Sequence, residues 1–152
     1  MLTTYAASYN GIQYYGRWIY DGTRRYTKTQ YSKCVFTFLG SSVRVNFNTR
    51  SDGGKAKIYL DGVEQCTVDT LNTENLKQML FEKENICGDK IHELEVVSEK
   101  VKERPEAVLE VWSFEAEEIV NYPQYMRDRK LKEYDDISKG IKETSNRIVG
   151  KK

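Results

Sequence analysis

The sequence predicts an all-β protein with antiparallel strands, and two features of residues 34–69 support this prediction. Apolar and polar side chains alternate along short runs, and a period of two is typical of strands with one buried face. Turn residues separate the runs, and an Asp-Gly pair indicates a tight hairpin because both positions need positive φ. The predicted strands are residues 34–39, 43–48, 55–60 and 63–69, with turns at 40–42, 51–54 and 61–62.

Residues 1–33 show a less regular pattern. Residues 1–11 predict an edge strand that closes a sandwich. Residues 12–21 predict a strand that Gly16 interrupts, because glycine inside a strand often marks a bulge or the close approach of another backbone. Residues 22–33 are polar and are expected to form a long exposed loop, and such loops on sandwiches are often functional.

The chain after residue 69 predicts one irregular segment and two further strands. A short helix or an irregular crossover is expected within residues 70–85, followed by a brief strand at 80–81. Residues 90–98 and 107–115 alternate again, and the second run is apolar on both faces, which indicates a central or doubly covered strand. The helix would rest on three side chains spaced like one helical turn: Leu76, Met79 and Leu80.

From residue 119 the period changes, so we divide the chain into a β-sandwich domain, 1–118, and a helical extension or linker, 119–152. Gly140 interrupts the expected helix at a cost of about 1 kcal/mol relative to alanine. A narrow apolar stripe cannot form a core alone, so it would lie on the sandwich, pair with copies of itself or continue into a partner. The stripe consists of Tyr134, Ile137, Ile141 and Ile148.

The overall charge of +1 conceals an uneven distribution. Residues 124–152 hold nine of the 24 basic and five of the 23 acidic residues, a net charge of +4. The rest of the chain therefore holds 15 basic and 18 acidic residues, a net charge of −3. The net negative charge of residues 1–123 argues against nucleic-acid binding, which needs a basic face. The mixed signs of the tail indicate a solvated helix.

The three cysteines are odd in number and lack metal-ligand spacing, so we expect free thiols, with Cys34 and Cys66 buried. No signal peptide is predicted, because the first residues lack a basic start and an apolar run. No segment approaches the roughly 20 apolar residues of a membrane span. We therefore expect a reducing compartment, or a fragment whose export signal lies elsewhere.

The sequence predicts no catalytic site. His92 is the single histidine and falls on the apolar phase of a predicted strand, so we expect a hydrogen-bonded core residue and not a catalytic base. No Gly-x-Ser-x-Gly elbow and no glycine-rich phosphate loop is present. The alternation places acidic pairs such as Glu93/Glu95 on solvated strand faces. We therefore expect a protein that is not an enzyme.

Aromatic and polar side chains gather in residues 14–26 and suggest a ligand-binding surface. Sugars present apolar C–H faces and hydroxyl edges, so they need aromatic platforms with Arg, Asn or Asp partners. Residues 48–52 contain such partners. The alternative for Trp18 is a place in the core, and for the polar residues a solvated loop. The candidate ligand-binding residues are Tyr15, Arg17, Trp18, Tyr26, Arg50 and Asp52.

A series of short motifs resembles a known family. The motifs are YYGRW, FTFLGSSVRV, GGKAKIYLDG, ICGDKIHELEV and VWSFE. Together they cover about residues 10–116 and resemble the galactose-binding-like jelly-roll β-sandwich of carbohydrate-binding modules, which also occurs beside some esterases and glycosidases. The positions that match the family pattern belong to turns and to the core and are not ligand-binding residues. They are Phe38, Gly40, Asp61, Gly62, His92 and Leu94.

The resemblance implies noncatalytic glycan recognition, through loops at one end of the sandwich or across one face. Similar domains occur in bacteriophage tail fibres and baseplates, and the extension after Pro123 fits that setting. The resemblance thus implies a virion or cytoplasmic location, or a fragment of a larger surface protein. A homo-oligomer or larger assembly would form through the C-terminal helix.

The alternative to glycan recognition is a structural or oligomerisation module that has no glycan ligand. We expect neither nucleic acid nor membrane as a partner, and no cofactor. A Ca²⁺ site is common in sandwiches of this family, but its only traces in the sequence are Asp52 and Asp61 in predicted turns.

Overall fold

The computed structural model describes residues 2–118, which form ten strands and no helix. All pairings between these strands are antiparallel, which confirms the predicted fold class. The expected C-terminal helix lies outside the described residues. In the described range, no helix is present that could cross a membrane. The strands are β1 (Leu2–Ala6), β2 (Ile12–Tyr15), β3 (Ile19–Asp21), β4 (Arg24–Thr27), β5 (Lys33–Thr49), β6 (Lys55–Leu60), β7 (Val63–Asp69), β8 (Leu76–Lys83), β9 (Ile91–Glu99) and β10 (Leu109–Glu118).

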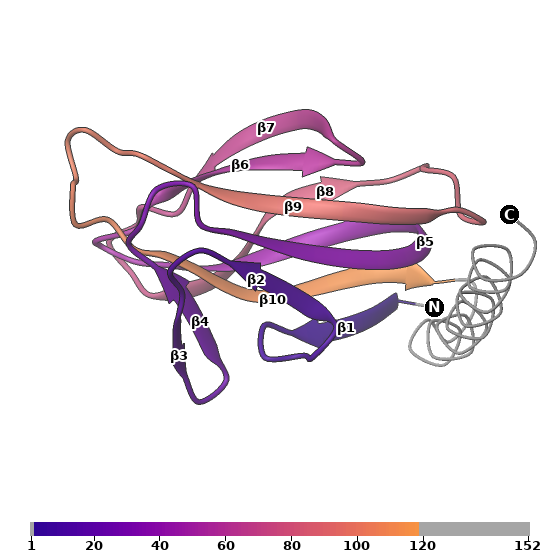
Figure 1. Cartoon of the computed structure of the whole chain (residues 1–152), viewed down its shortest axis with the longest axis horizontal. Coiled ribbons are helices and arrows are strands. Elements are labelled where there is room, and N and C mark those ends of the chain that lie inside the picture. Colours follow the sequence, from indigo (N-terminus) through magenta and orange to yellow (C-terminus); the bar gives the residue numbers. More distant parts are fainter. Residues whose placement is uncertain (1, 119–152) are drawn as a thin grey trace, which may run out of the picture. The chain divides into compact units, whose positions relative to one another are not determined.

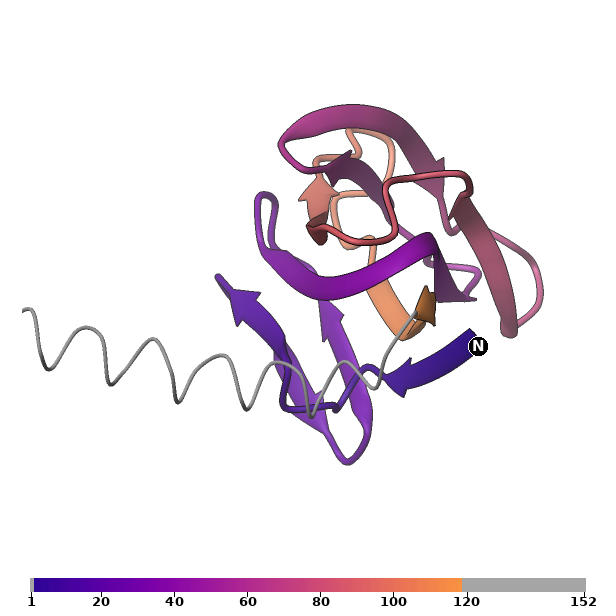
Figure 2. The ribbon, with the colours of Figure 1, turned by 90° about the vertical axis from the view of Figure 1, so that its right-hand side faces the viewer.

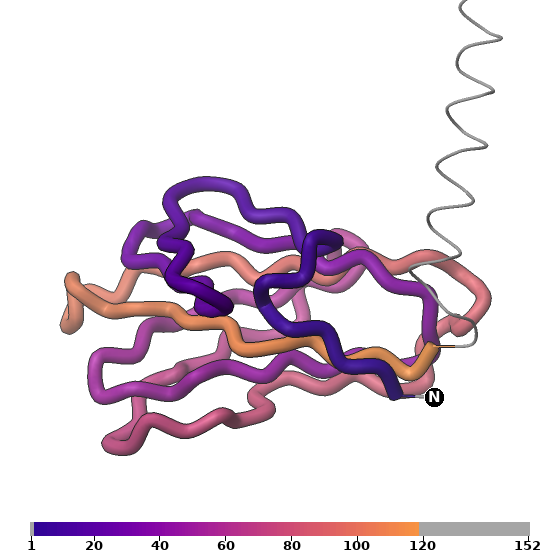
Figure 3. Tube along the Cα trace, turned by 90° about the horizontal axis from the view of Figure 1, so that it is seen from below, coloured from indigo at the N-terminus to yellow at the C-terminus, as the bar shows by residue number. Residues whose placement is uncertain are grey.

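The strands form two sheets that share β5 (Figure 1). Sheet A has the order β3-β4-β10-β5-β8, and β1 also pairs with β10. Sheet B has the order β2-β5-β9-β6-β7. Figure 2 looks along the strands and shows them arranged around the core, and Figure 3 shows β1 beside the C-terminal part of β10. This all-β, antiparallel arrangement agrees with the fold class that the sequence predicts.

Strand β5 differs from the sequence prediction, which placed a turn at residues 40–42. The structure has one strand of 17 residues instead. Its first half pairs with β2 and β9, and its second half pairs with β10 and β8. The strand passes between the sheets at Gly40, where an added Cβ would lie 2.3 Å from the carbonyl oxygen of Glu117. Glycine is required there because β10 approaches too closely for a side chain.

Residues 12–33 also differ from the prediction. The single strand expected at 12–21 is two short strands in different sheets, because Gly16 has a φ of +97° and redirects the chain. The expected long loop at 22–33 contains β4, which forms a hairpin with β3 and pairs with β10. The predicted edge strand in residues 1–11 is confirmed as β1.

The segment expected to be a helix or an irregular crossover contains β8, which pairs with β5. The register shifts within this pair: Val45 pairs with Phe81, whereas Asn46 pairs with Met79. Leu80 is therefore an extra residue in a β-bulge, which bends a strand and changes the side-chain phase. The bulge explains why the apolar spacing in this segment resembles a helical turn.

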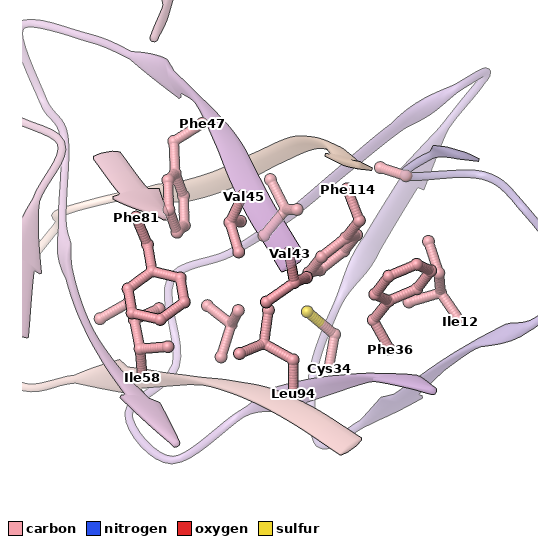
Figure 4. Close-up of a cluster of buried hydrophobic side chains, with 14 of the residues drawn as sticks. Ile12, Cys34, Phe36, Val43, Val45, Phe47, Ile58, Phe81, Leu94 and Phe114 are labelled. Atoms are coloured by element: carbon pink, nitrogen blue, oxygen red, sulfur yellow. The ribbon is translucent and has the colours of Figure 1, made fainter. Parts of the chain in front are cut away.

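The core lies between the two sheets and follows the predicted alternation. Figure 4 shows Val43, Val45 and Phe47 of β5 clustered with buried residues of neighbouring strands. The rings of Phe36 and Phe114 stack with centroids 4.8 Å apart. Burying each such side chain contributes roughly 1.5–3 kcal/mol to folding. β10 pairs with β1, β4 and β5, which confirms the prediction of a central strand.

The cysteines and the single histidine occupy structural positions. Cys34 is a fully buried free thiol whose pKa is raised by burial, and Cys66 is a half-buried free thiol. His92 is buried, with Nδ1 2.6 Å from the Asp61 carboxylate and Nε2 2.6 Å from the carbonyl oxygen of Cys87. Asp61 and Gly62 both have positive φ, as predicted for the hairpin turn. His92 is therefore the hydrogen-bonded core histidine that the sequence predicted.

Candidate functional site

The outer face of sheet A carries the richest set of polar side chains. Strand register places Tyr26 of β4 beside Glu110 of β10, and Asn48 of β5 beside Lys77 of β8. Because alternate residues of a strand point to the same face, these four side chains form a row across the sheet. The sequence analysis selected Tyr26 from this row. It did not predict that β4, β10, β5 and β8 are neighbours.

Glu110 is the centre of this face. Its side chain is 1% exposed, and its carboxylate accepts hydrogen bonds from Arg24 Nε at 3.2 Å and Nη2 at 3.1 Å. Arg50 Nη1 donates to the same carboxylate at 3.1 Å, and Asn48 also donates to it. Burial alone would raise the pKa of Glu110, but these donors outweigh it and lower the pKa. Glu110 is therefore a stable anion between two arginines.

Three of the residues predicted from sequence belong to the contact network around this carboxylate: Arg50 binds it directly, and Asp52 and Tyr26 contact the arginines that do. Asp52 accepts two hydrogen bonds from Arg50, at 2.7 and 3.1 Å, and so fixes its guanidinium. The ring of Tyr26 packs against both arginines, 4.8 Å from Arg24 Cζ and 6.0 Å from Arg50 Cζ. Such cation–π contacts and bidentate pairs hold long side chains in one position. We call Arg24, Tyr26, Arg50, Asp52 and Glu110 the Glu110 cluster.

A shallow hollow of about 330 Å³ adjoins the Glu110 cluster. Trp112 lines it and is 46% exposed. Trp112 lies two residues before the buried Phe114, so simple alternation would place both side chains on the same face. A β-bulge between Val111 and Ser113 changes the phase and leaves the indole ring outside. The full lining is Thr4, Ala6, Thr23, Arg24, Lys77, Glu110, Val111, Trp112 and Ser113.

The hollow and the Glu110 cluster contain residues that the sequence analysis did not select. Arg24, Lys77, Glu110 and Trp112 are the main ones. The sequence held only a weak indication that Trp112 is exposed. A strand that is apolar on both faces either leaves one face exposed to solvent or has that face covered by another part of the protein. Glu110 lies within that apolar run as its single central charge, which is the signal that could have identified it.

The other three predicted residues lie elsewhere. Trp18 is 8% exposed, and its Nε1 donates to the carbonyl oxygens of Tyr15 and Lys33 at 3.0 and 3.1 Å. Trp18 is therefore a core residue and cannot serve as an exposed platform, which corrects its selection as a ligand-binding residue. Tyr15 is half-exposed on β2, with Lys33 Nζ 5.4 Å from its ring centroid. Arg17 lies between β2 and β3, where its backbone N–H donates to Ser32.

The two aspartates considered for Ca²⁺ are occupied by other contacts. The Asp52 carboxylate pairs with Arg50, and the Asp61 carboxylate contacts His92 and the backbone N–H of Glu93. Ca²⁺ needs six to eight oxygen ligands around one point. Within residues 2–118, no three acidic, histidine or cysteine side chains converge on a point that could hold a metal ion.

The fold is shared with solved carbohydrate-binding modules, as the resemblance in the sequence implied. The chain resembles the CBM36-1 domain of a multidomain xylanase from the hindgut metagenome of Trinervitermes trinervoides, with a TM-score of 0.58 and 10% identity. That match covers 76% of this chain and 95% of the domain. A family 35 carbohydrate binding module from an environmental isolate matches with a TM-score of 0.53 and 12% identity, covering 74% of this chain and 90% of the module.

Two comparisons involve larger proteins. A family two carbohydrate esterase from Cellvibrio japonicus matches with a TM-score of 0.60 and 13% identity, over 76% of this chain and 33% of the esterase. An A type blood N-acetyl-alpha-D-galactosamine deacetylase from Flavonifractor plautii is 32% identical over 78 residues, 51% of this chain. The chain spans about 10% of that deacetylase. No family model matches the sequence.

Proposed function

We propose that this chain is a noncatalytic carbohydrate-binding module that holds a glycan on the outer face of sheet A. The observation that carries this proposal is the exposed Trp112 ring in a hollow beside the fixed Glu110 cluster. A sugar ring would place its apolar C–H face on the indole. Its hydroxyl groups would exchange hydrogen bonds with Arg24, Lys77 and Ser113 along the lining.

The rigidity of the cluster supports this proposal. Binding immobilises side chains at a cost of about 0.5–1.5 kcal/mol each. Arg24 and Arg50 are already held by Glu110, and Arg50 is also held by Asp52. A ligand would therefore find Arg24 already ordered, so a hydrogen bond from Arg24 to a sugar hydroxyl would form at a lower entropic cost.

The comparisons also support a noncatalytic role, because two of the solved structures with this fold are themselves carbohydrate-binding modules. The esterase and the deacetylase are much longer than this chain, so their activities can reside outside the matched part. His92, the single histidine, has both ring nitrogens in contact with Asp61 and Cys87. It is thus committed to the fold and does not face the hollow.

A glycan array followed by titration calorimetry tests the proposal. We expect Trp112→Ala to weaken the best glycan at least tenfold, about 1.4 kcal/mol, because the stacking platform is removed. The matched control is Tyr15→Ala, which removes a half-exposed aromatic ring from sheet B. Both variants should keep the wild-type circular dichroism spectrum. A loss of binding in Tyr15→Ala but not in Trp112→Ala would place the site on sheet B and contradict the proposal.

We further propose that the module works inside a larger assembly, either a phage tail or similar complex in a virion or in the cytoplasm, or a multidomain surface protein of which it is a fragment. The small share of the esterase and the deacetylase that the chain spans supports the multidomain protein among these settings. An alternative function as an interaction module without a glycan ligand is favoured by apolar side chains on the exposed surface, such as Met79 and Trp112. The glycan array separates the two functions, since the interaction module would bind no glycan.

A further inference from the structure

We propose that the hollow prefers acidic glycans, in which a carboxylate or sulfate on the sugar contacts Lys77 while the sugar ring lies on Trp112. This inference rests on the proposed function and names the class of glycan. The geometry that supports it is the placement of both side chains in one hollow: Trp112 belongs to β10 and Lys77 to β8, on either side of β5.

The charges that line the hollow leave one cation uncompensated. Arg24 and Lys77 contribute two positive charges and Glu110 one negative charge, which gives a net charge of +1. Arg24 and Glu110 pair with each other. Lys77 is exposed and has no ion pair with another residue in the range 2–118. A ligand anion would therefore meet an ammonium group that no carboxylate already neutralises.

The neighbouring charges give the ligand a direction. On one side, Arg50 is neutralised by Asp52 and also contacts Glu110. On the other side, Arg44 pairs with Glu82 and contacts Glu115 at 3.8 Å. That second group carries one positive and two negative charges, so it repels an anion. The acidic substituent should therefore lie at the Lys77 end of the face and away from Arg44, Glu82 and Glu115.

Lysine suits this role because its ammonium group is a mobile point charge on a flexible stem. It can reach an acidic substituent at different positions of a sugar ring, whereas the arginines of the Glu110 cluster are fixed. A charge-assisted hydrogen bond is roughly twice as strong as a neutral one. Removing the Lys77 ammonium group should therefore weaken the binding of an acidic glycan more than that of its neutral counterpart. Salt should reduce this difference in affinity by screening the charges.

The test uses the full chain and matched pairs of glycans. The probes are an oligogalacturonide, a glucuronoxylan oligosaccharide and a sialyllactose, each with its carboxyl-reduced form, and a sulfated and an unsulfated galactose oligomer. We expect Lys77→Gln to weaken the acidic or sulfated member about tenfold and the neutral member less than twofold. The control is Lys83→Gln, which removes the same charge from the same strand at a position that pairs with the buried Val43.

The outcomes separate this inference from the proposed function. If Trp112→Ala abolishes glycan binding but acidic and neutral members bind equally, the acidic preference is overturned and the proposed function stands. If Lys83→Gln weakens acidic glycans as much as Lys77→Gln, the effect is one of net charge and the assignment to Lys77 is wrong. If no glycan depends on Trp112, both proposals fail. A preference for only the carboxylates or only the sulfates identifies the substituent.

Discussion

At the scale of single residues, Glu110 shows how a buried charge can be tolerated and used. Its carboxylate is almost fully removed from water, yet Arg24, Arg50 and Asn48 supply its hydrogen bonds. An unpaired buried carboxylate would cost several kcal/mol, so the three partners and Glu110 depend on one another. The same contacts hold Arg24 at the hollow, so stability and the proposed binding surface share one carboxylate.

This dependence predicts a pH effect on stability. Because the pKa of Glu110 is lowered in the folded state, its stabilisation is present above its ordinary value of 4.5 and is lost as pH falls through the lowered pKa. We expect Glu110→Gln to reduce the free energy of unfolding at pH 7 by about 1–3 kcal/mol, since two arginines lose their anionic partner. Urea denaturation at a series of pH values measures this loss.

The difference between wild type and Glu110→Gln should shrink as the pH falls from 4.5 through the lowered pKa of Glu110, because the unfolded chain binds the proton first and the folded carboxylate becomes neutral only below that lowered pKa. Glu93→Gln is the matched control, because this exposed carboxylate on β9 should cause little change at any pH. A difference between Glu110→Gln and wild type that stays constant from pH 7 to pH 3 would contradict the assigned role of Glu110.

The site was partly predictable from sequence at this scale. Tyr26, Arg50 and Asp52 were identified because polar and aromatic residues of those types stand out in loop-like sequence, and in the structure both Tyr26 and Asp52 contact Arg50. Trp112 was missed because simple alternation cannot show a β-bulge, which reverses the face of a side chain. Trp18 was selected for its type, and only tertiary packing shows that its ring is buried.

At the scale of elements, strand β5 connects the two sheets and thereby positions the site. Its second half carries Asn48 next to Glu110 on sheet A, while its first half packs within sheet B. The residues of this strand were predicted to be extended, but the connection at Gly40 was interpreted as a turn. Glycine permits both a turn and a close backbone approach, so the sequence alone cannot distinguish them.

Two glycine substitutions distinguish a close backbone approach at Gly40 from a simple turn. We expect Gly40→Ala to reduce the free energy of unfolding by roughly 3 kcal/mol, because the new Cβ would meet the Glu117 backbone at 2.3 Å. Gly62→Ala, in the β6–β7 turn, should cost roughly 1 kcal/mol, since its φ is +81° but no atom lies within 4 Å of its added Cβ. Urea denaturation monitored by circular dichroism compares them, and equal losses would argue against close packing at Gly40.

At the scale of the whole molecule, residues 1–119 form one compact unit with the described core inside it. The alternating pattern sufficed to predict this core, because inward-facing residues of β5, β6 and β9 repeat every second position. The assignment of strands to two sheets was not predictable from alternation, because pairing partners lie far apart in sequence. β1 and β10, for example, bond across more than a hundred residues.

The compact unit predicts that a chain ending at residue 119 folds by itself. We expect its melting temperature to lie within a few degrees of the full chain, a difference below about 1 kcal/mol, because the described core is complete.

Light scattering of both chains tests the proposed assembly through residues 119–152. The shorter chain should be a monomer. The full chain should form a dimer or a larger oligomer, since the apolar stripe from Tyr134 to Ile148 needs a partner. A shorter chain that melts much earlier would show instead that the stripe packs on the sandwich, and a monomeric full chain would remove the support for assembly through it.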